Sequence, residues 1–436
     1  MSTITYEAES EQQAETVSPF LMLFLEYAKQ VGAFWVLEKL VKVKMKSVVY
    51  GPLQKAQTIM ASLVMGCQHT KAINEVLGEE LGAANYLWME RFPDQSQINR
   101  YLTRFDADNV AQLGEAQLQL FEEQSLARRA VGQVVVDIDQ CGLVVSGKTY
   151  EWARKGYFPR KRGEAGYQLS LAYIGAYEEV INTYMDPGNT HCAHRLRDLL
   201  HDIERGLLTH NPGVTVIRRL DAGYDSVANR ALLAELPGYF LLKGDDHRTA
   251  ARLARAVLVQ NWWPVADGVH GTEVAAEGTI RRLVYEFLLA DGRVEYALLY
   301  TNLPASDLSV SRAFAFYNER TTIEAFFASA RHTFNIQSMR SRQFNAIAAF
   351  LRFVALTHNL IHWVKHARLA DTPLEQATTS QLVFGVSRVR AHILWDGHWH
   401  LSILCVSRCA KLLLEALTRV PRPVQLELPF ARLYKT

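Results

Sequence analysis

The sequence QVVVDIDQCGLVVSG, at residues 133–147, decides the fold because its β-branched residues predict two strand-forming runs joined by a turn. Side chains alternate between the faces of a strand, so one face of the first run is apolar and the other contains Asp137 and Asp139. Ionised carboxylates beside a buried sheet are costly unless they are hydrated, paired or bound to a metal, and the flanking sequence offers no obvious basic partner. A metal site is one interpretation of this strand, and a solvated strand end is the other.

Further strands and helices follow on the C-terminal side of this stretch. Strands are predicted at 169–177, 179–185, 214–223 and 239–244, and helices at 193–208 and about 226–236. Three or four strands followed by alternating helices and strands predict an α/β domain with a mixed sheet. By analogy, this order matches a ribonuclease H-like catalytic core.

The segments on either side of the core have different patterns. Apolar residues recur at helical spacing from Ser18 to about Phe121 and again from Ser309 to His366, whereas a hairpin is predicted around Asp291-Gly292. We therefore expect five segments. They are a helical DNA-binding domain at 1–130, the first part of the core at 131–244, a β-rich insertion at 245–303, the second part of the core at 304–370, and a helical C-terminal region with a tail at 371–436.

A candidate DNA-reading helix lies in the N-terminal segment. SQINRYLTRF, at residues 96–105, follows a Pro-Asp turn, so Ser96 could cap a short helix that presents Arg100. Arginine side chains bind base edges and phosphates. An ordinary amphipathic surface helix is the alternative interpretation.

A second acidic residue is predicted at the end of another core strand. Asp221 closes the strand VTVIRRLD, and Gly223 just beyond it can turn the chain toward the next helix, for which Asp225 is a candidate N-cap. In open α/β sheets, ligands bind beyond the carboxyl ends of the strands. We therefore expect Asp139 and Asp221 to meet at one site.

The segment YNERTTIEAFFASARHTF, at residues 317–334, predicts a helix with two distinct faces. At about 100° per residue, an apolar arc lies beside a polar arc of about 60°, which contains Tyr317, Arg320, Glu324 and Arg331. Docking of the apolar arc on the sheet would bring Glu324 toward the strand ends. The two arginines could then bind phosphates, and the tyrosine could support the site. An exposed helix face with an Arg320–Glu324 ion pair is the alternative.

Three blocks of the sequence together resemble the bacterial insertion-sequence transposases of the DDE class. The spacing Tyr-x2-Arg-x3-Glu-x6-basic is similar to the Tyr-Arg-Glu-Lys signature of that class, with Arg331 in the position of its lysine. DIDQCGL resembles the first catalytic block, with Cys141 in the position of its threonine, and RLDAGYDS resembles the second block. The resemblance covers residues 132–366, and segment 245–303 is similar to the β-rich insertion of the hairpin-forming members.

The resemblance implies a cut-and-paste DNA transposase. In such an enzyme Asp139, Asp221 and Glu324 are both the catalytic residues and the ligands of two Mg²⁺ ions, or Mn²⁺, about 3.5 to 4 Å apart. The ions assist strand cleavage and the attack of a DNA 3′-hydroxyl on target DNA. Two alternatives remain open: a transposase-derived DNA-binding protein that no longer cleaves, and a structure-selective nuclease of the same fold.

The implied partners are double-stranded DNA at the element ends, target DNA and a second copy of the chain, because two DNA ends imply at least a dimer in such enzymes. Trp262 or Trp263 is expected to stack on a flipped base, with core packing as the alternative. The tail QLELPF, at 425–430, resembles a peptide that binds the bacterial replication sliding clamp, with packing onto the core as the alternative. The expected DNA-binding residues are Tyr317, Arg320, Arg331, Trp262, Trp263 and Arg100.

Composition predicts a folded chain with several domains. Of the 436 residues, 49% are hydrophobic and 21% are charged, and a net charge of +2 does not by itself indicate nucleic-acid binding. The five cysteines include no Cys-x-x-Cys pair, so neither a disulfide framework nor a zinc knuckle is suggested. The first apolar run, 20–25, is too short for a signal segment or a membrane span, and we expect a cytoplasmic, nucleoid-associated bacterial protein.

Three histidines lie on one predicted helix. His358, His362 and His366 share a helix face, but the residues between them lack the glutamate of the His-Glu-x-x-His zinc motif. A structural or phosphate-facing role is therefore expected.

Overall fold

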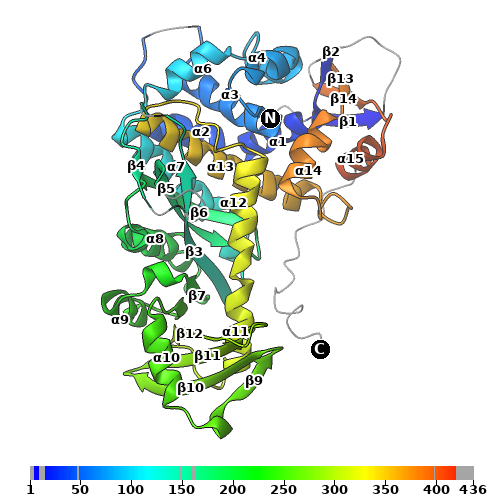
Figure 1. Ribbon diagram of the computed structural model, residues 1–436. Coiled ribbons are helices and arrows are strands. Elements are labelled where there is room, and N and C mark those ends of the chain that lie inside the picture. The colour runs from blue at the N-terminus through cyan, green and yellow to red at the C-terminus, as the bar shows by residue number, and fades with distance from the viewer. Residues whose placement is uncertain are drawn as a thin grey trace.

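The computed structural model describes residues 4–8, 15–46, 49–147, 149–156, 158, 163–396 and 398–418. Figure 1 shows an elongated molecule. The N-terminal helices and a small sheet lie at one end, a large sheet runs through the middle, and β9 to β12 form the other end.

The large sheet has ten strands among the described residues, in the order β4-β5-β3-β7-β8-β12-β11-β10-β9, and β6 pairs with β5. β3 is antiparallel to β5 and parallel to β7, and β7 is parallel to β8. These directions confirm the predicted α/β class with a mixed sheet. The strands are β3 (Gln133–Val144), β4 (Arg154–Lys155), β5 (Ala165–Ile174), β6 (Glu179–Pro187), β7 (Thr215–Leu220), β8 (Tyr239–Lys243), β9 (Trp263–Ala266), β10 (Val269–Glu277), β11 (Ile280–Leu288) and β12 (Val294–Thr301).

Strand β3 is longer than the sequence predicts. The two runs expected at 133–147 form one continuous strand up to Val144, so the predicted turn is wrong. Gly142 lies within the strand, where a Cβ atom would come 2.4 Å from the ring of Phe158. A close approach of Phe158, and not a turn, accounts for this glycine.

The strand-rich segment at 245–303 continues the same sheet. β12 pairs with β8 in antiparallel register, from Leu299↔Lys243 to Thr301↔Leu241. β11 and β12 form the predicted hairpin, and Gly292 in its turn has a φ of +80°, which favours glycine. α10 (His247–Arg255) packs on β11 and β12. Backbone hydrogen bonds therefore join this segment directly to the strands that precede it.

The N-terminal segment is mainly helical, although strands at Ile4–Ala8 and Glu15–Val17 precede its helices, and four of these helices pack against one long helix, α13 (Phe344–Arg368). α13 also packs against β6, so one hydrophobic core connects the helical end to the sheet. The N-terminal helices are α1 (Pro19–Gln30), α2 (Ala33–Leu40), α3 (Pro52–Val64), α4 (Ala72–Val76), α5 (Leu81–Tyr86), α6 (Gln95–Leu102) and α7 (Ala107–Gln124).

Helix α13 is long and apolar enough to cross a membrane by length and composition alone. However, 94% of its most apolar window is buried inside the protein. The bent pair α1 and α2 passes the same test only if the two helices count as one span. Both placements are those of core helices.

The C-terminal region is only partly helical, so the expectation of a helical region is wrong in part. β13 (Ala391–Trp395) and β14 (Trp399–Ile403) form a hairpin between α14 (Thr379–Phe384) and α15 (Arg408–Thr418). The hairpin joins β1 (Ile4–Ala8) and β2 (Glu15–Val17) in a sheet of order β1-β14-β13-β2. β1 and β14 pair although they are almost 400 residues apart, and no local sequence pattern predicts such a pairing.

Two predicted helix caps are wrong by one or two residues. α6 is capped by Asp94, whose side chain accepts hydrogen bonds from the backbone of Ser96 and Gln97, and not by Ser96. α9 (Val227–Glu235) is capped by Ser226, because Asp225 pairs with Arg230 instead. The helix expected at 193–208 is present as α8 (Leu196–Ile203), followed by a π-helical turn.

The helix predicted at 317–334 is interrupted. α11 (Val310–Asn318) and α12 (Thr322–His332) form one column along the sheet, with the 3-10 turn Glu319–Thr321 between them (Figure 1). Ile323 and Phe327 of the predicted apolar arc are buried. The predicted docking of this face is therefore confirmed for α12.

Helix α13 contains a buried histidine pair. The rings of His358 and His362 are 4.3 Å apart. His358 Nε2 donates to the carbonyl oxygen of Glu178 at 3.0 Å, and His362 Nδ1 lies 2.9 Å from the Glu178 carboxylate. Burial lowers the pKa of both histidines. These contacts support the structural interpretation of the pair.

We expect acidification to destabilise the fold through this pair. Below about pH 6.5, the ordinary histidine pKa, the unfolded chain binds protons that the folded chain excludes, so the free energy of unfolding falls. The loss should reach about 1 kcal/mol or more by about pH 5.5, as measured by denaturant unfolding. His358→Gln should flatten the decline, whereas His332→Gln, at an exposed position, should not. An equally steep decline in His358→Gln would contradict the assignment.

Candidate active site

Asp139 and Asp221 lie where the parallel pairing of β3 with β7 ends: Asp221 directly follows β7, whereas Asp139 lies within β3, which continues to Val144. β3 and β7 pair with Ile138 opposite Leu220, and each aspartate is the next residue along its strand direction. Both carboxylates face the guanidinium of Arg320. Arg320 Nη1 is 2.9 Å from Asp139 Oδ2, and Nη2 is 3.9 Å from Asp221 Oδ1. The structure thus brings together the two strand-borne acids that the sequence singles out.

The two aspartates have different surroundings. The Asp139 side chain is 17% exposed, and burial raises its pKa, while the Arg320 charge and the Gln140 N–H lower it. The Asp221 side chain is 44% exposed and accepts a hydrogen bond from the Ala222 N–H at 2.7 Å. Asp139 therefore depends more strongly on a positive partner than Asp221 does.

Asp137, on the same face of β3, has its own partner. Arg219 Nε and Nη2 donate to its two carboxylate oxygens at 2.7 and 2.9 Å. The basic partners of these acids, Arg219 and Arg320, come from elements distant in sequence, so the flanking sequence gives no sign of them. The carboxylate of Asp137 is fully buried and already paired.

Glu324 belongs to α12, one helical turn beyond Arg320. It is exposed, and no hydrogen bond or ion pair joins it to another residue in the described part of the chain. Arg320 lies four residues earlier, in the 3-10 turn that precedes α12. Within the described ranges, no group of three or more His, Cys, Asp or Glu side chains is close enough to hold a metal ion. In the described part of the chain, the structure therefore does not bring the third predicted acid together with the two aspartates.

Tyr317 and Arg331 flank this face of the helix. The Tyr317 hydroxyl donates to the carbonyl oxygen of Leu220 at 3.4 Å, directly before Asp221, and its ring lies 5.9 Å from Arg320 Cζ. Arg331 lies beside the thiol of Cys141, whose pKa burial raises to about 12. The Arg331 Nε is buried and has no hydrogen-bond partner among the residues that the structure describes.

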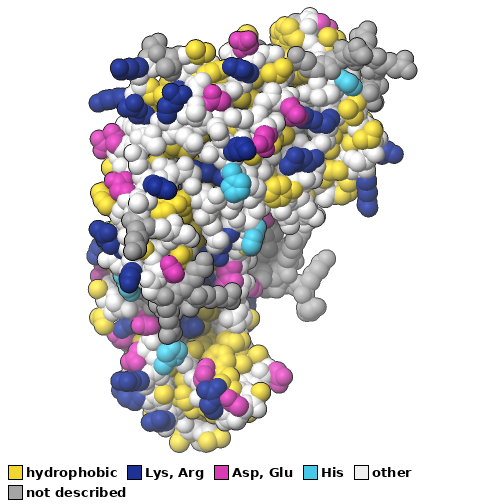
Figure 2. Space-filling model, turned by 45° about the horizontal axis from the view of Figure 1, so that its top comes forward, with side chains coloured by type: hydrophobic (Ala, Val, Ile, Leu, Met, Phe, Trp, Pro, Cys, Tyr) yellow, Lys and Arg dark blue, Asp and Glu magenta, His cyan; other side chains and the backbone are white. Residues whose placement is uncertain are grey.

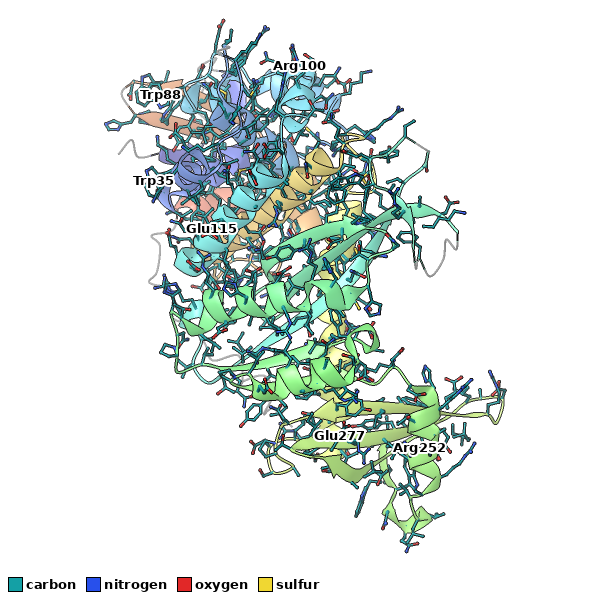
Figure 3. The ribbon with its side chains drawn as sticks, turned by 90° about the vertical axis from the view of Figure 1, so that its left-hand side faces the viewer. Trp35, Trp88, Arg100, Glu115, Arg252 and Glu277 are labelled. Atoms are coloured by element: carbon teal, nitrogen blue, oxygen red, sulfur yellow. The ribbon has the colours of Figure 1, made fainter. Side chains whose placement is uncertain are left out.

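The remaining predicted DNA-binding residues lie away from this site. Trp263 is 61% exposed at the start of β9, the outermost strand of the sheet, and Trp262 packs partly against the core. Arg100 is exposed on α6 and donates back to Ser96. Figure 3 places Arg100 at the opposite end of the molecule from Arg252 and Glu277.

Charge is mixed over the surface. Figure 2 shows Lys and Arg side chains interspersed with Asp and Glu side chains on one face, in keeping with the net charge of +2. A nucleic-acid surface on this face would therefore depend on local groups of arginines and lysines, and not on the charge of the whole chain.

Two residues that contact Asp137 were not predicted from the sequence. Arg219 and Thr322 both bind Asp137, and Thr322 Oγ1 donates to Asp137 Oδ2 at 3.1 Å. One signal was present for Arg219: strand alternation places it on the same face as Asp221, two residues later. No local pattern marks Thr322.

The family comparison matches most of the chain. The family described as "Transposase DDE domain group 1" matches residues 81–420, and the protein belongs to this family of DDE transposases. No curated protein matches the sequence.

Two solved transposase structures are similar to the chain. One is a cryo-EM structure of the piggyBac transposase in a synaptic complex with hairpin DNA, at 11% identity and a TM-score of 0.44, covering 86% of this chain and 82% of that chain. The other is the Mos1 transposase in a paired-end complex with the left transposon end. It has 17% identity and a TM-score of 0.17, and covers 44% of this chain and 58% of that chain.

Proposed function

We propose that this transposase cleaves DNA at the ends of its mobile element and joins the 3′-hydroxyl ends to target DNA. The observation that carries the proposal is the approach of Asp139 and Asp221 to one guanidinium, at the point where the parallel pairing of β3 with β7 ends. Membership of a DDE transposase family supports the same conclusion.

Asp139, Asp221 and Glu324 are the residues that would hold Mg²⁺ or Mn²⁺. Carboxylate oxygens are the ligands that these hard cations prefer, and the largely buried Asp139 already needs a positive partner, so the donor set fits. Glu324 follows Arg320 by four residues, and Arg320 faces both aspartates, which supports Glu324 as the third ligand. When bound, the ions activate a water or a 3′-hydroxyl and stabilise the leaving oxygen.

Other side chains of the protein bind and orient the DNA in this proposal. Arg320 and Arg331 match phosphate oxygens with their guanidinium groups. Tyr317 supports the strand end that precedes Asp221. Exposed Trp263 offers a π-face to an unpaired base, with Trp262 beside it, and Arg100 binds DNA at the helical end.

The finer assignments of fold and origin are also proposals. The order β6-β5-β3-β7-β8, antiparallel and then parallel, supports a ribonuclease H-like core interrupted by the segment at 245–303 and preceded by a DNA-binding domain at 1–130. We further propose a nucleoid-associated homodimer of bacterial insertion-sequence type, with a Tyr-Arg-Glu-Lys-like signature. The sliding-clamp motif at 425–430 lies outside the described residues.

A strand-transfer assay tests the proposed function. The DNA flanking the gene would be searched for terminal inverted repeats, and pre-cleaved ends that carry them would be incubated with the protein, Mg²⁺ and a target plasmid. We expect joined products. Cleavage of intact ends without joining would indicate the structure-selective nuclease, and binding without either reaction would indicate a DNA-binding derivative.

We expect Arg331→Gln to weaken DNA binding in a salt-dependent way. One lost phosphate contact releases about one counterion fewer, so the log–log slope of affinity against salt should become shallower by about 1. Fluorescence anisotropy with DNA that carries the element ends measures this slope. Arg312→Gln, at an exposed position on α11, is the control. An unchanged slope would assign Arg331 to packing against Cys141 and Phe327.

A further inference from the structure

Asp137 and Arg219 form a buried ion pair directly beneath the candidate site. They are register partners on the parallel strands β3 and β7, and each lies two residues before one of the candidate acids, Asp139 and Asp221. The side chains of Asp137 and Arg219 are 0% and 4% exposed. The pair is therefore built into the same two strands that present the carboxylates.

Both members of the pair also bind the helical column. Arg219 Nη1 donates to the carbonyl oxygen of Phe316 at 2.5 Å, and its guanidinium lies 5.0 Å from the Phe316 ring. Thr322 Oγ1 donates to Asp137 Oδ2 at 3.1 Å. Phe316 lies in the last turn of α11, where a cation is favoured by the helix dipole, and Thr322 is the first residue of α12.

These two contacts bracket the break in the column. The 3-10 turn Glu319–Thr321 contains Arg320, and α12 beyond it contains Glu324 and Arg331. A hydrogen bond on each side of the turn fixes the direction in which α12 leaves it. Gly175 packs closely against Thr322, because a Cβ atom at Gly175 would come 2.4 Å from Thr322 Oγ1.

Stability alone does not account for the pair. Taking two charges out of water is costly, and replacing a buried ion pair by apolar residues of similar size is often neutral or stabilising. A bidentate arginine fork fixes geometry as well as charge. The burial of the Asp137–Arg219 pair is explained if the pair sets the position of α12 relative to β3 and β7.

We propose that Asp137, Arg219 and Thr322 form a clamp that positions the helix-borne Arg320 and Glu324 against the strand-borne Asp139 and Asp221. This inference rests on the proposed function for its consequence but not for its geometry. Asp137 is then a positioning residue and not a metal ligand, because both of its oxygens are already bound by Arg219.

A double variant separates positioning from stability. Arg219→Met alone leaves a buried carboxylate without its partner and should lower the unfolding midpoint strongly. Asp137→Leu combined with Arg219→Met removes both charges and should leave the unfolding midpoint close to that of the wild type. The matched control is Glu273→Leu with Arg281→Met, because Arg281 binds Glu273 through two nitrogens and donates to the Leu303 and Leu308 carbonyls.

Hydrogen–deuterium exchange and Mn²⁺ titration are the two readouts. In the clamp double variant, amide exchange across 319–334 should rise about tenfold, since at least one helix-anchoring hydrogen bond is lost. Mn²⁺ affinity, followed by electron paramagnetic resonance, should fall by about 10- to 100-fold. Neither quantity should change in the control double variant.

The outcomes distinguish the clamp from the proposed function. Unchanged exchange across 319–334 in the double variant overturns the clamp, whatever happens to Mn²⁺. If amide exchange rises in the double variant but the wild-type protein binds no Mn²⁺, the clamp is retained and the metal site is contradicted. If the double variant fails to fold, Thr322→Val decides. Thr322→Val should raise amide exchange across 319–334, whereas Thr322→Ser, which keeps the hydroxyl, should leave exchange at the wild-type level. Equal exchange in the two variants overturns the clamp.

Discussion

Asp139→Ala, Asp221→Ala and Glu324→Ala should each reduce Mg²⁺-dependent cleavage of element-end DNA by about a thousandfold or more. Metal ions contribute several kcal/mol to the stabilisation of charge in the transition state, and each 1.36 kcal/mol is about tenfold in rate. Single-turnover cleavage of end-labelled DNA measures the loss. DNA binding should remain close to that of the wild type, because a metal ligand and not a DNA contact is removed.

Neighbouring Asp137 provides the discriminating comparison. Asp137→Asn should be milder than Asp139→Asn, because Asp137 is fully buried and bound by Arg219, whereas Asp139 is partly exposed and faces Arg320. The reverse order of severity would move the metal site to Asp137. Wild-type cleavage in any of the three alanine variants would remove that residue from the site.

Arg320→Gln should change metal binding and catalysis in opposite directions. The guanidinium neutralises Asp139 and approaches Asp221, so it competes with any cation for the same oxygens. Without DNA, Mn²⁺ affinity should therefore rise by about tenfold, the equivalent of one charge-assisted hydrogen bond. Cleavage should nevertheless fall by about a hundredfold, because the phosphate loses a positioned positive partner.

The two effects are measured on the same preparations. Mn²⁺ binding is followed by electron paramagnetic resonance without DNA, and cleavage is followed with the element-end DNA. Arg312→Gln, on the exposed surface of α11, should alter neither quantity. A loss of Mn²⁺ affinity in Arg320→Gln would show that Arg320 supports the metal site and does not compete with it.

The sequence by itself predicted the parts of the site that obey a local period. Alternation along a strand places Asp137 and Asp139 on one face, and a strand end places Asp221 beside a turn. Helical spacing of 3.6 residues groups Arg320 with Glu324 and predicts the buried face of α12. These properties depend on neighbours within a few residues, so they can be read before the chain is folded.

Only the tertiary structure decided which of these groups meet. Arg219 finds Asp137 because β3 and β7 pair in one parallel register, and Arg320 reaches both site aspartates because the column breaks at residues 319–321. The pairing of β12 with β8 and of β1 with β14 likewise joins segments that are far apart in the sequence. Such contacts depend on strand register and on packing across the whole fold. A periodic pattern of neighbouring residues does not encode either of these.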